Sequence, residues 1–236
     1  MRFQDAARDA RAVVYAGIQA DPLVARVATL LAEATPAERW MARAVMNGER
    51  TDPEIWRRIF PSLFGEGAAA AGAAAGPAVG PAAAEIRDRA EKLMAASLEV
   101  ANRGEQARSQ YRGAVVEELT AQLLARRGGP VKRERRVLFD GIPAEIHPYD
   151  VTVESPARPQ VYDCKWGARG INADVLNQLD DARSHAADEE IELIVALVVF
   201  DARKSAEIRL DRSTTRRDGT RVVALETFDE LAEARP

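Results

Sequence analysis

The chain contains very little cysteine and histidine. Cys164 is the one cysteine among 236 residues, and His147 and His185 are the two histidines. A single thiol excludes an intrachain disulfide and any zinc cluster built on cysteines. Two histidines also leave little for a histidine-based metal site.

Long apolar runs are also missing. The longest, Leu193–Phe200, has the length of a strand and falls well short of the ~20 residues of a transmembrane helix. The first residues lack the basic start and the apolar stretch of a signal peptide. We therefore expect a cytoplasmic globular protein without a membrane partner. The net charge of −4 argues against a broadly basic nucleic-acid surface, although a local basic groove is compatible with it.

Residues 1–64 carry apolar side chains at helical spacing. Breaks fall at Asp21-Pro22, Thr35-Pro36 and Asp52-Pro53, each of which joins an N-cap residue to a proline in the first helical turn. This pattern predicts an all-helical module of short helices. The apolar residues that set the period include Val13, Val14, Ile18, Leu23, Val24, Val27, Leu30 and Leu31.

The next segment, residues 65–84, consists largely of alanine, glycine and proline. It carries too little apolar surface to offset the cost of ordering, so we predict a flexible linker. Residues 85–104 then show a narrow apolar stripe and are predicted to form a connecting helix, interrupted at Arg103-Gly104.

Residues 105–236 mix helical and strand patterns and predict an α/β domain. A helix over about 109–127 is expected to end at Gly128-Gly129-Pro130. The further elements expected are strands over 132–139, 144–147 with 149–154, 160–166 and 193–200, a helix over 172–185, and a late strand over 221–225 with a terminal helix over 227–234.

Charged residues stand where strand residues are expected to be apolar. Asp150 opens one predicted strand, and Asp163 and Lys165 close the next, although aspartate and lysine are poor strand residues. If Ser155 lies opposite Gln160 across a four-residue loop, Asp150 faces Lys165, and all three charged side chains share one face of the sheet.

Magnesium-dependent phosphodiester hydrolysis would explain this arrangement. Two carboxylates would hold the metal, and the lysine would steady water and developing charge. The alternative is that both aspartates are edge-strand charges and Lys165 is a surface lysine.

The preceding helix offers a further carboxylate. Glu117 lies four residues after Gly113, so both stack on one helix face, where a glycine would let the helix approach the sheet closely. Glu117 could then reach the metal site. Glu118 is the second candidate for this role, and a third possibility is that both glutamates are solvated.

Together these motifs resemble the PD-(D/E)xK nuclease superfamily. The matching positions, within about residues 105–205, are Gly113-x-x-x-Glu117, Pro148-Tyr149-Asp150, Asp163-Cys164-Lys165 and Gln178 on the following helix. The resemblance implies a restriction-endonuclease-like mixed sheet flanked by helices, with an αβββαβ core, preceded here by the helical module.

The resemblance also implies roles for individual residues. Asp150, Asp163, the main-chain carbonyl of Cys164 and Glu117 would bind Mg²⁺, with Mn²⁺ as a substitute. Lys165 would orient or activate the attacking water, and Gln178 matches a polar position of the family. Arg133, Arg135, Arg136 and Arg169 could contact phosphates, or they could be solvated charges that protect a strand edge.

The function expected from these residues is that of a magnesium-dependent nuclease. DNA is the expected substrate, endonucleolytic cleavage the expected reaction, and bacterial defence or restriction a role by family analogy. The alternatives are an inactive nuclease fold with a binding role and a nuclease toxin with a helical leader. The N-terminal helices are expected to form a homodimer or to bind a protein partner.

Overall fold

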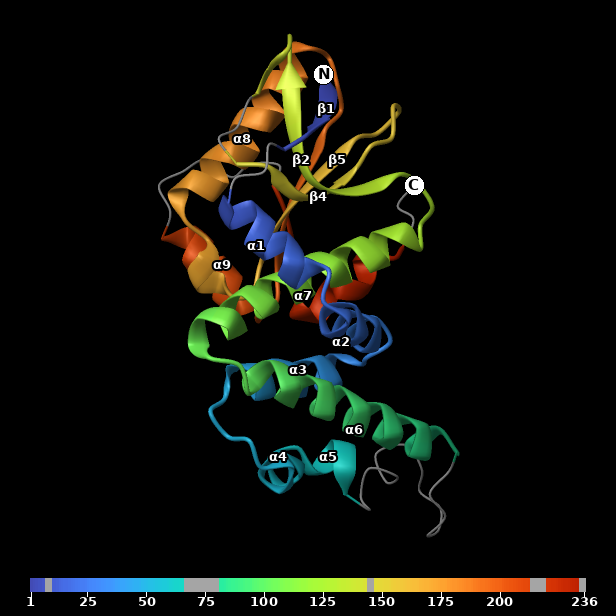
Figure 1. Ribbon diagram of the computed structural model, residues 1–236. Coiled ribbons are helices and arrows are strands. Elements are labelled where there is room, and N and C mark those ends of the chain that lie inside the picture. Colours follow the sequence, from blue (N-terminus) through green and yellow to red (C-terminus); the bar gives the residue numbers. More distant parts are fainter. Residues whose placement is uncertain (7–9, 66–80, 144–146, 213–219, 234–236) are drawn as a thin grey trace. The chain divides into compact units, whose positions relative to one another are not determined.

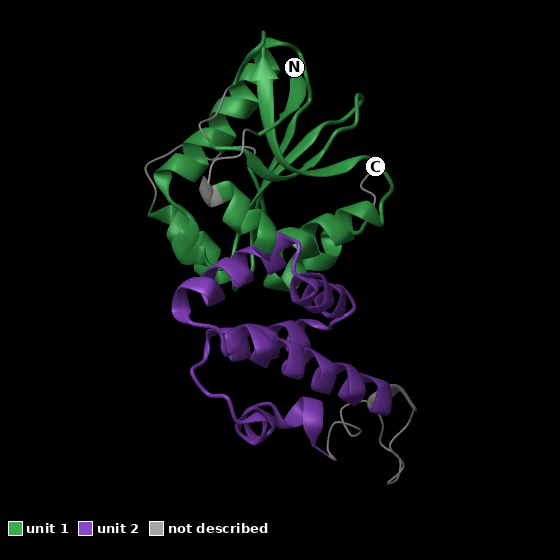
Figure 2. Cartoon of the chain, viewed as in Figure 1, with its two compact units in different colours: residues 1–17, 116–236 green, residues 18–115 purple. Residues whose placement is uncertain are grey.

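The computed structural model describes residues 1–6, 10–65, 81–143, 147–212 and 220–233 (Figure 1). The chain forms two compact units (Figure 2). We call residues 1–17 with 116–236 the sheet unit and residues 18–115 the helical unit. No helix of the described residues is long and apolar enough to cross a membrane.

The sheet unit is built on a mixed sheet of seven strands within the described residues. The strand order is β1-β2-β4-β5-β6-β7, with β3 paired to β2. Pairs from β1 to β5 are antiparallel, whereas β5, β6 and β7 run parallel. The strands are β1 (Arg2–Asp5), β2 (Val131–Phe139), β3 (Ile142–Pro143), β4 (Tyr149–Val153), β5 (Gln160–Lys165), β6 (Ile194–Val199) and β7 (Arg221–Ala224).

Crossover helices join the parallel strands, as parallel pairing requires. Helix α8 (Ala173–Asp188) connects β5 to β6, and α9 (Arg203–Asp211) connects β6 to β7. Strand β6 has a parallel neighbour on each side and is buried along almost its whole length, which accounts for its continuous apolar sequence. The α/β class predicted from the sequence is therefore confirmed.

Helix α8 has two features that favour a helix at this place, an N-cap residue and an apolar stripe. Asn172 caps its N-terminus by accepting a hydrogen bond from the Val175 amide at 3.0 Å. Its apolar stripe joins the core beneath strands β5 and β6. The buried residues of that stripe are Leu176, Leu179, Ala182 and Ala186.

Helix α7 (Glu105–Ala125) is divided between the two units at Val115–Val116. In its second half Val116, Leu119 and Leu123, which share one apolar face of the helix, are buried. The chain leaves the helix through Gly128 and Gly129, which both have positive φ, so the predicted glycine stop is present.

The helical unit contains α2 (Pro22–Ala32), α3 (Pro36–Asn47), α4 (Pro53–Ile59), α5 (Pro61–Phe64) and α6 (Pro81–Ala101). Asp21, Thr35 and Asp52 cap α2, α3 and α4 with a proline in each first turn, so these predicted helix starts are confirmed. Helix α6 packs on α2 and α3. The buried Glu38 carboxylate accepts two hydrogen bonds from Arg89 on α6, both at 2.9 Å.

The observed division of the chain differs from the predicted boundaries in two places. The first residues are not part of a helical module, because β1 pairs with β2 and extends the sheet. The predicted connecting helix is α6, which starts at Pro81 and belongs to the helical unit. Most of the predicted linker, residues 66–80, lies outside the described residues.

Helix α1 (Ala10–Gln19) exposes valines that the sequence predicted to be buried. The predicted apolar positions Val13 and Val14 are 58% and 62% exposed, whereas Tyr15 is half-buried. Apolar spacing alone therefore assigned the wrong face of this helix to the interior.

Candidate active site

The pairing of β4 with β5 brings the predicted acids together. Val151 lies opposite Tyr162, and Val153 opposite Gln160. If this ladder is continued by one pair, Asp150 lies opposite Asp163. The sequence predicted Asp150 opposite Lys165. The predicted register is therefore wrong by two residues. The connection spans residues 154–159 and is two residues longer than expected. An even shift leaves every side chain on its predicted face.

Asp150, Asp163 and Lys165 form one group, which we call the candidate cluster. The Lys165 Nζ atom lies 4.0 Å from Asp150 Oδ2 and forms an ion pair with Asp163 Oδ1. The side chains of Asp150 and Lys165 are 25% and 23% exposed, and that of Asp163 is 10% exposed. The cluster is therefore largely desolvated but open to solvent on one side.

Electrostatics in the cluster favour an additional cation. Burial raises the pKa of Asp150 well above its usual value, and the Asp163 and Glu117 carboxylates raise it further. Burial also raises the pKa of Asp163, although Lys165 opposes that rise. Burial would lower the pKa of Lys165, but the two aspartates outweigh burial and raise it. Three carboxylates thus share one ammonium group, an excess that a divalent cation would relieve.

Glu117, on α7, is the glutamate that belongs to this site. It is buried, and its Oε1 atom accepts a hydrogen bond from the Tyr15 hydroxyl at 2.5 Å. Glu118 instead forms an ion pair with Arg133 of β2 at 2.8 Å. The structure thus brings Glu117, rather than Glu118, close enough for its charge to raise the pKa of Asp150.

Tyr15 is a site residue that the sequence did not indicate. Burial and the neighbouring Glu117 carboxylate raise the pKa of its hydroxyl, so the group stays protonated and donates. No motif surrounds it, and it lies about a hundred residues before the helix that it contacts. The one sequence signal is that Tyr15 follows Val13 and Val14 directly, so it points to a different side of α1 from these two exposed valines.

Cys164 contributes its backbone to the cluster. The Cys164 amide donates a hydrogen bond to Asp150 Oδ2 at 2.6 Å, where the backbone ladder between β4 and β5 has ended. In a strand the N–H and C=O of one residue point to the same edge, so the Cys164 carbonyl faces this gap as well. The thiol is buried and lies 3.6 Å from Thr120 Oγ1.

Gln178 lies on α8, the helix that was predicted to carry it. Its side-chain Nε2 atom donates a hydrogen bond to the main-chain carbonyl of His147 at 3.1 Å. The main-chain carbonyl of Gln178 accepts a hydrogen bond from the Tyr149 hydroxyl, also at 3.1 Å. Gln178 therefore anchors α8 to the segment that leads into β4. These contacts support a positioning role for Gln178, since they hold the strand that carries Asp150.

The predicted phosphate-binding arginines are only partly available. Arg133 is paired with Glu118, and Arg135 is paired with Glu154 and Asp5. Arg136 is half-buried on β2. Arg169 is exposed in the short η2 turn (Ala168–Gly170) that follows β5. Within this set, Arg169 is the residue whose exposure best suits a phosphate contact.

The η2 turn also limits the space around Lys165. A Cβ atom on Gly170 would lie 3.0 Å from Lys165 Cδ and 3.3 Å from Lys165 Cβ. The turn is held by Asp201, whose Oδ2 atom accepts a hydrogen bond from the Ala168 amide at 3.1 Å. The lysine stem thus packs directly against a fixed glycine.

The donors of this site suit a hard metal ion. Asp150, Asp163, Glu117 and the Cys164 carbonyl all offer oxygen, which Mg²⁺ prefers. Among the described residues, no set of three or more His, Cys, Asp and Glu side chains is arranged as a formed metal centre. Since Lys165 is paired with Asp163 and approaches Asp150, a bound cation would have to share these carboxylates with its ammonium group.

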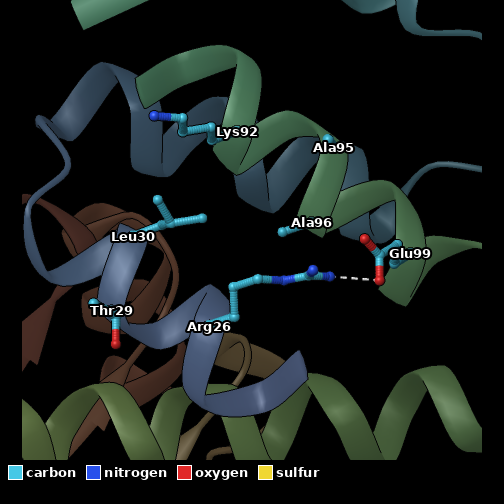
Figure 3. A pocket seen from close by; sticks show the side chains of 7 residues that line it. All are labelled: Arg26, Thr29, Leu30, Lys92, Ala95, Ala96 and Glu99. Carbon is cyan, nitrogen blue, oxygen red and sulfur yellow. Dashed lines mark ion pairs between the residues drawn. The ribbon is translucent and has the colours of Figure 1, made fainter. Parts of the chain in front are cut away.

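A separate hollow lies within the helical unit, between α2 and α6 (Figure 3). Leu30, Ala95 and Ala96 line it with apolar surface, and Arg26 and Glu99 form an ion pair of 2.5 Å across it. It shares no residue with the candidate cluster.

Comparison with known proteins adds no assignment: no protein-family model, curated protein or solved structure matches the chain.

Proposed function

We propose that this protein is a magnesium-dependent nuclease, with DNA as the expected substrate. The observation that carries this proposal is the convergence of Asp150, Asp163 and Lys165 at the separating ends of β4 and β5. Glu117 supports it, because α7 brings a third carboxylate to the same place.

The order of elements supports a restriction-endonuclease-like fold. Helix α7, strands β2, β4 and β5, helix α8 and strand β6 follow one another as αβββαβ, with β3 as a short addition. The two acids lie on the second and third strands of this series, where the resemblance to PD-(D/E)xK nucleases puts them.

In the proposed mechanism, different residues would bind the metal ion and stabilise the transition state. Asp150, Asp163, Glu117 and the Cys164 carbonyl would hold the metal ion. When bound, Mg²⁺ supplies electrostatic stabilisation of the phosphate and a lowered pKa of water. Lys165 has a raised pKa and keeps its proton on Nζ, so it serves as a cationic donor to the nonbridging oxygens rather than as a base.

The direct test is a cleavage assay. The purified full chain is incubated with supercoiled plasmid, linear duplex, single-stranded DNA and RNA, each with Mg²⁺, Mn²⁺ or EDTA. We expect metal-dependent cleavage of DNA that Asp163→Asn abolishes. Asp88→Asn is the matched control, because Asp88 is an exposed carboxylate paired with a lysine in the helical unit and should leave cleavage unchanged.

Two results would count against the proposal. Cleavage that persists in EDTA and in Asp163→Asn would show that another group, or a contaminant, performs the reaction. Metal-independent DNA binding without cleavage would instead favour the non-catalytic nuclease fold.

A further inference from the structure

A hydrogen bond joins the N-terminal helix to the candidate active site. The Tyr15 hydroxyl on α1 donates to Glu117 Oε1 on α7 at 2.5 Å. Both residues belong to the sheet unit, although they are 102 positions apart in the sequence. The acceptor is a buried carboxylate, and its charge is one of the causes that raise the pKa of Asp150, after burial and Asp163.

Tyr15 does not serve an apolar interface of its helix. Among the described side chains of α1, residues 12–19, none is fully buried, and Val13 and Val14 are largely exposed. The half-buried Tyr15 ring thus carries its hydroxyl to Glu117 from a helix with little other burial. A contact of this kind is better explained by what the hydroxyl does for the carboxylate.

Carboxylates that ligate metals depend on partners that fix their orientation. Groups that donate hydrogen bonds to such ligands typically change metal affinity 10–100-fold when they are removed. We propose that Tyr15 is a positioning residue, which orients the Glu117 carboxylate toward the cation bound at Asp150 and Asp163. This inference rests on the proposed function, and it adds α1 to the elements that build the site.

The test compares Mn²⁺ affinity in the full-length wild type and Tyr15→Phe, measured by isothermal titration calorimetry. Phenylalanine keeps the ring and removes only the donor, so we expect about 10–100-fold weaker Mn²⁺ binding. Cleavage by Tyr15→Phe should fall at limiting Mn²⁺ and recover as Mn²⁺ is raised.

Tyr111→Phe is the matched control. Tyr111 also donates its hydroxyl to a carboxylate, that of Asp21, but within the helical unit. Its loss should leave Mn²⁺ affinity unchanged even where it lowers the thermal unfolding temperature. A general effect of losing a tyrosine–carboxylate bond is separated in this way from an effect at the site.

A double-mutant cycle ties the effect to Glu117. Glu117→Gln should weaken Mn²⁺ binding, and adding Tyr15→Phe to it should cause little further loss, because the two residues act through one contact. Losses that multiply independently would overturn the inference, since Tyr15 would then act elsewhere.

The remaining outcomes are equally decisive. Wild-type Mn²⁺ affinity in a folded Tyr15→Phe chain would overturn the inference and leave the proposed function standing. A Tyr15→Phe chain that fails to fold would show that the hydroxyl serves the fold, which also overturns it. A wild-type chain that binds no Mn²⁺ and cleaves no nucleic acid would overturn both the proposed function and the role of Tyr15.

Discussion

Lys165 holds a distinct position among the residues of this site, because its ammonium group contacts both acids of the candidate cluster. The carboxylates favour the charged lysine strongly enough to overcome its burial. The same ammonium group would compete with a metal ion for those oxygens. In the proposed mechanism, metal binding and catalysis would therefore make opposite demands on this side chain.

The first prediction concerns Lys165→Met. Methionine keeps the length of the stem and removes the charge, so cleavage should fall about 10²–10³-fold, the usual cost of deleting one donor to transition-state charge. Mn²⁺ should bind at least as tightly as to the wild type, because the competing ammonium is gone. Single-turnover cleavage and calorimetry measure the two effects.

Lys92→Met provides the control for this prediction, since Lys92 is an exposed lysine paired with Asp88 on α6. Lys92→Met should change neither the cleavage rate nor the Mn²⁺ affinity. Weakened Mn²⁺ binding in Lys165→Met would mean that the lysine organises the carboxylates instead of competing for them.

The second prediction concerns pH. The pKa of Asp150 is raised in the folded chain, so the unfolded chain ionises first, at about pH 3.9. Without metal, the free energy of unfolding should therefore fall as pH rises above that value, by about 1.4 kcal/mol for each unit of the pKa difference. Asp150→Asn cannot ionise and should escape this loss.

Urea unfolding in EDTA from pH 4 to pH 7 tests the second prediction. The stability of Asp150→Asn relative to the wild type should increase with pH above about 3.9, until Asp150 also ionises in the folded chain. A difference that shrinks with pH would show that Asp150 is stabilised as an anion in the folded state, the opposite of what its burial requires.

At the scale of elements, the hairpin of β4 and β5 shows what the sequence can and cannot predict. Alternation placed Asp163 and Lys165 on one face, and the structure brings both to Asp150. The predicted register is wrong because the loop begins before Pro156: pairing stops at Val153 and Gln160. The site survived this error because the shift was even.

Elements that depend on distant partners were missed. Strand β1 has four mostly exposed residues and exists because β2 offers it an edge, which no local pattern shows. The β2–β3 turn at Asp140-Gly141, where both residues have positive φ, has the Asp-Gly sequence that is typical of a two-residue hairpin turn. Helix α9 is weakly amphipathic, and no element is predicted over its residues from the sequence.

The third prediction concerns the η2 turn. Gly170→Ala would place a Cβ atom 3.0 Å from Lys165 Cδ, and the lysine stem would have to move. We expect reduced cleavage with little change in Mn²⁺ affinity, because the carboxylates stay in place. Kinetics and calorimetry on the same preparation measure both.

Gly17→Ala is the control for the third prediction. Gly17 is exposed on α1, and a Cβ atom there meets nothing within 4 Å. Alanine should raise stability by about 0.5–1 kcal/mol through its better helix propensity and leave the chemistry of the site unchanged. Equal activity of Gly170→Ala and the wild type would show that Lys165 can adopt another rotamer without loss.

At the scale of the whole molecule, the helical unit is an insertion. The sheet unit begins before it, with β1 and Tyr15, and resumes after it at Val116. The expectation of a nuclease domain confined to residues 105–236 therefore omits a strand and a site residue. Sequence periodicity could not reveal this, because it describes neighbours along the chain and not the pairing of β1 with β2.

The fourth prediction follows from this insertion. A site-specific protease sequence placed between residues 66 and 80 allows the chain to be cut inside the helical unit. The two fragments should stay together in native gel filtration, because α6 packs on α2 and α3 and the buried Glu38 holds Arg89 across the cut. Denaturing electrophoresis would show that cutting is complete.

The cut chain should also keep its cleavage activity, since β1, Tyr15 and the candidate cluster are untouched. Separation of the fragments at native pH would contradict the prediction and would mean that the helices before and after residues 66–80 are held together mainly by the chain itself.

The pairing of β1 with β2 has a consequence for the order of events during synthesis. Arg2 pairs with Leu138, so the first strand leaves the ribosome long before its partner is made. At about 5–20 residues per second, that interval lasts roughly 7–27 s. The inserted helices can be translated completely, and can fold, within it. The sheet is completed only after this interval, and until then β1 is an unpaired segment that a chaperone or a neighbouring nascent chain could occupy.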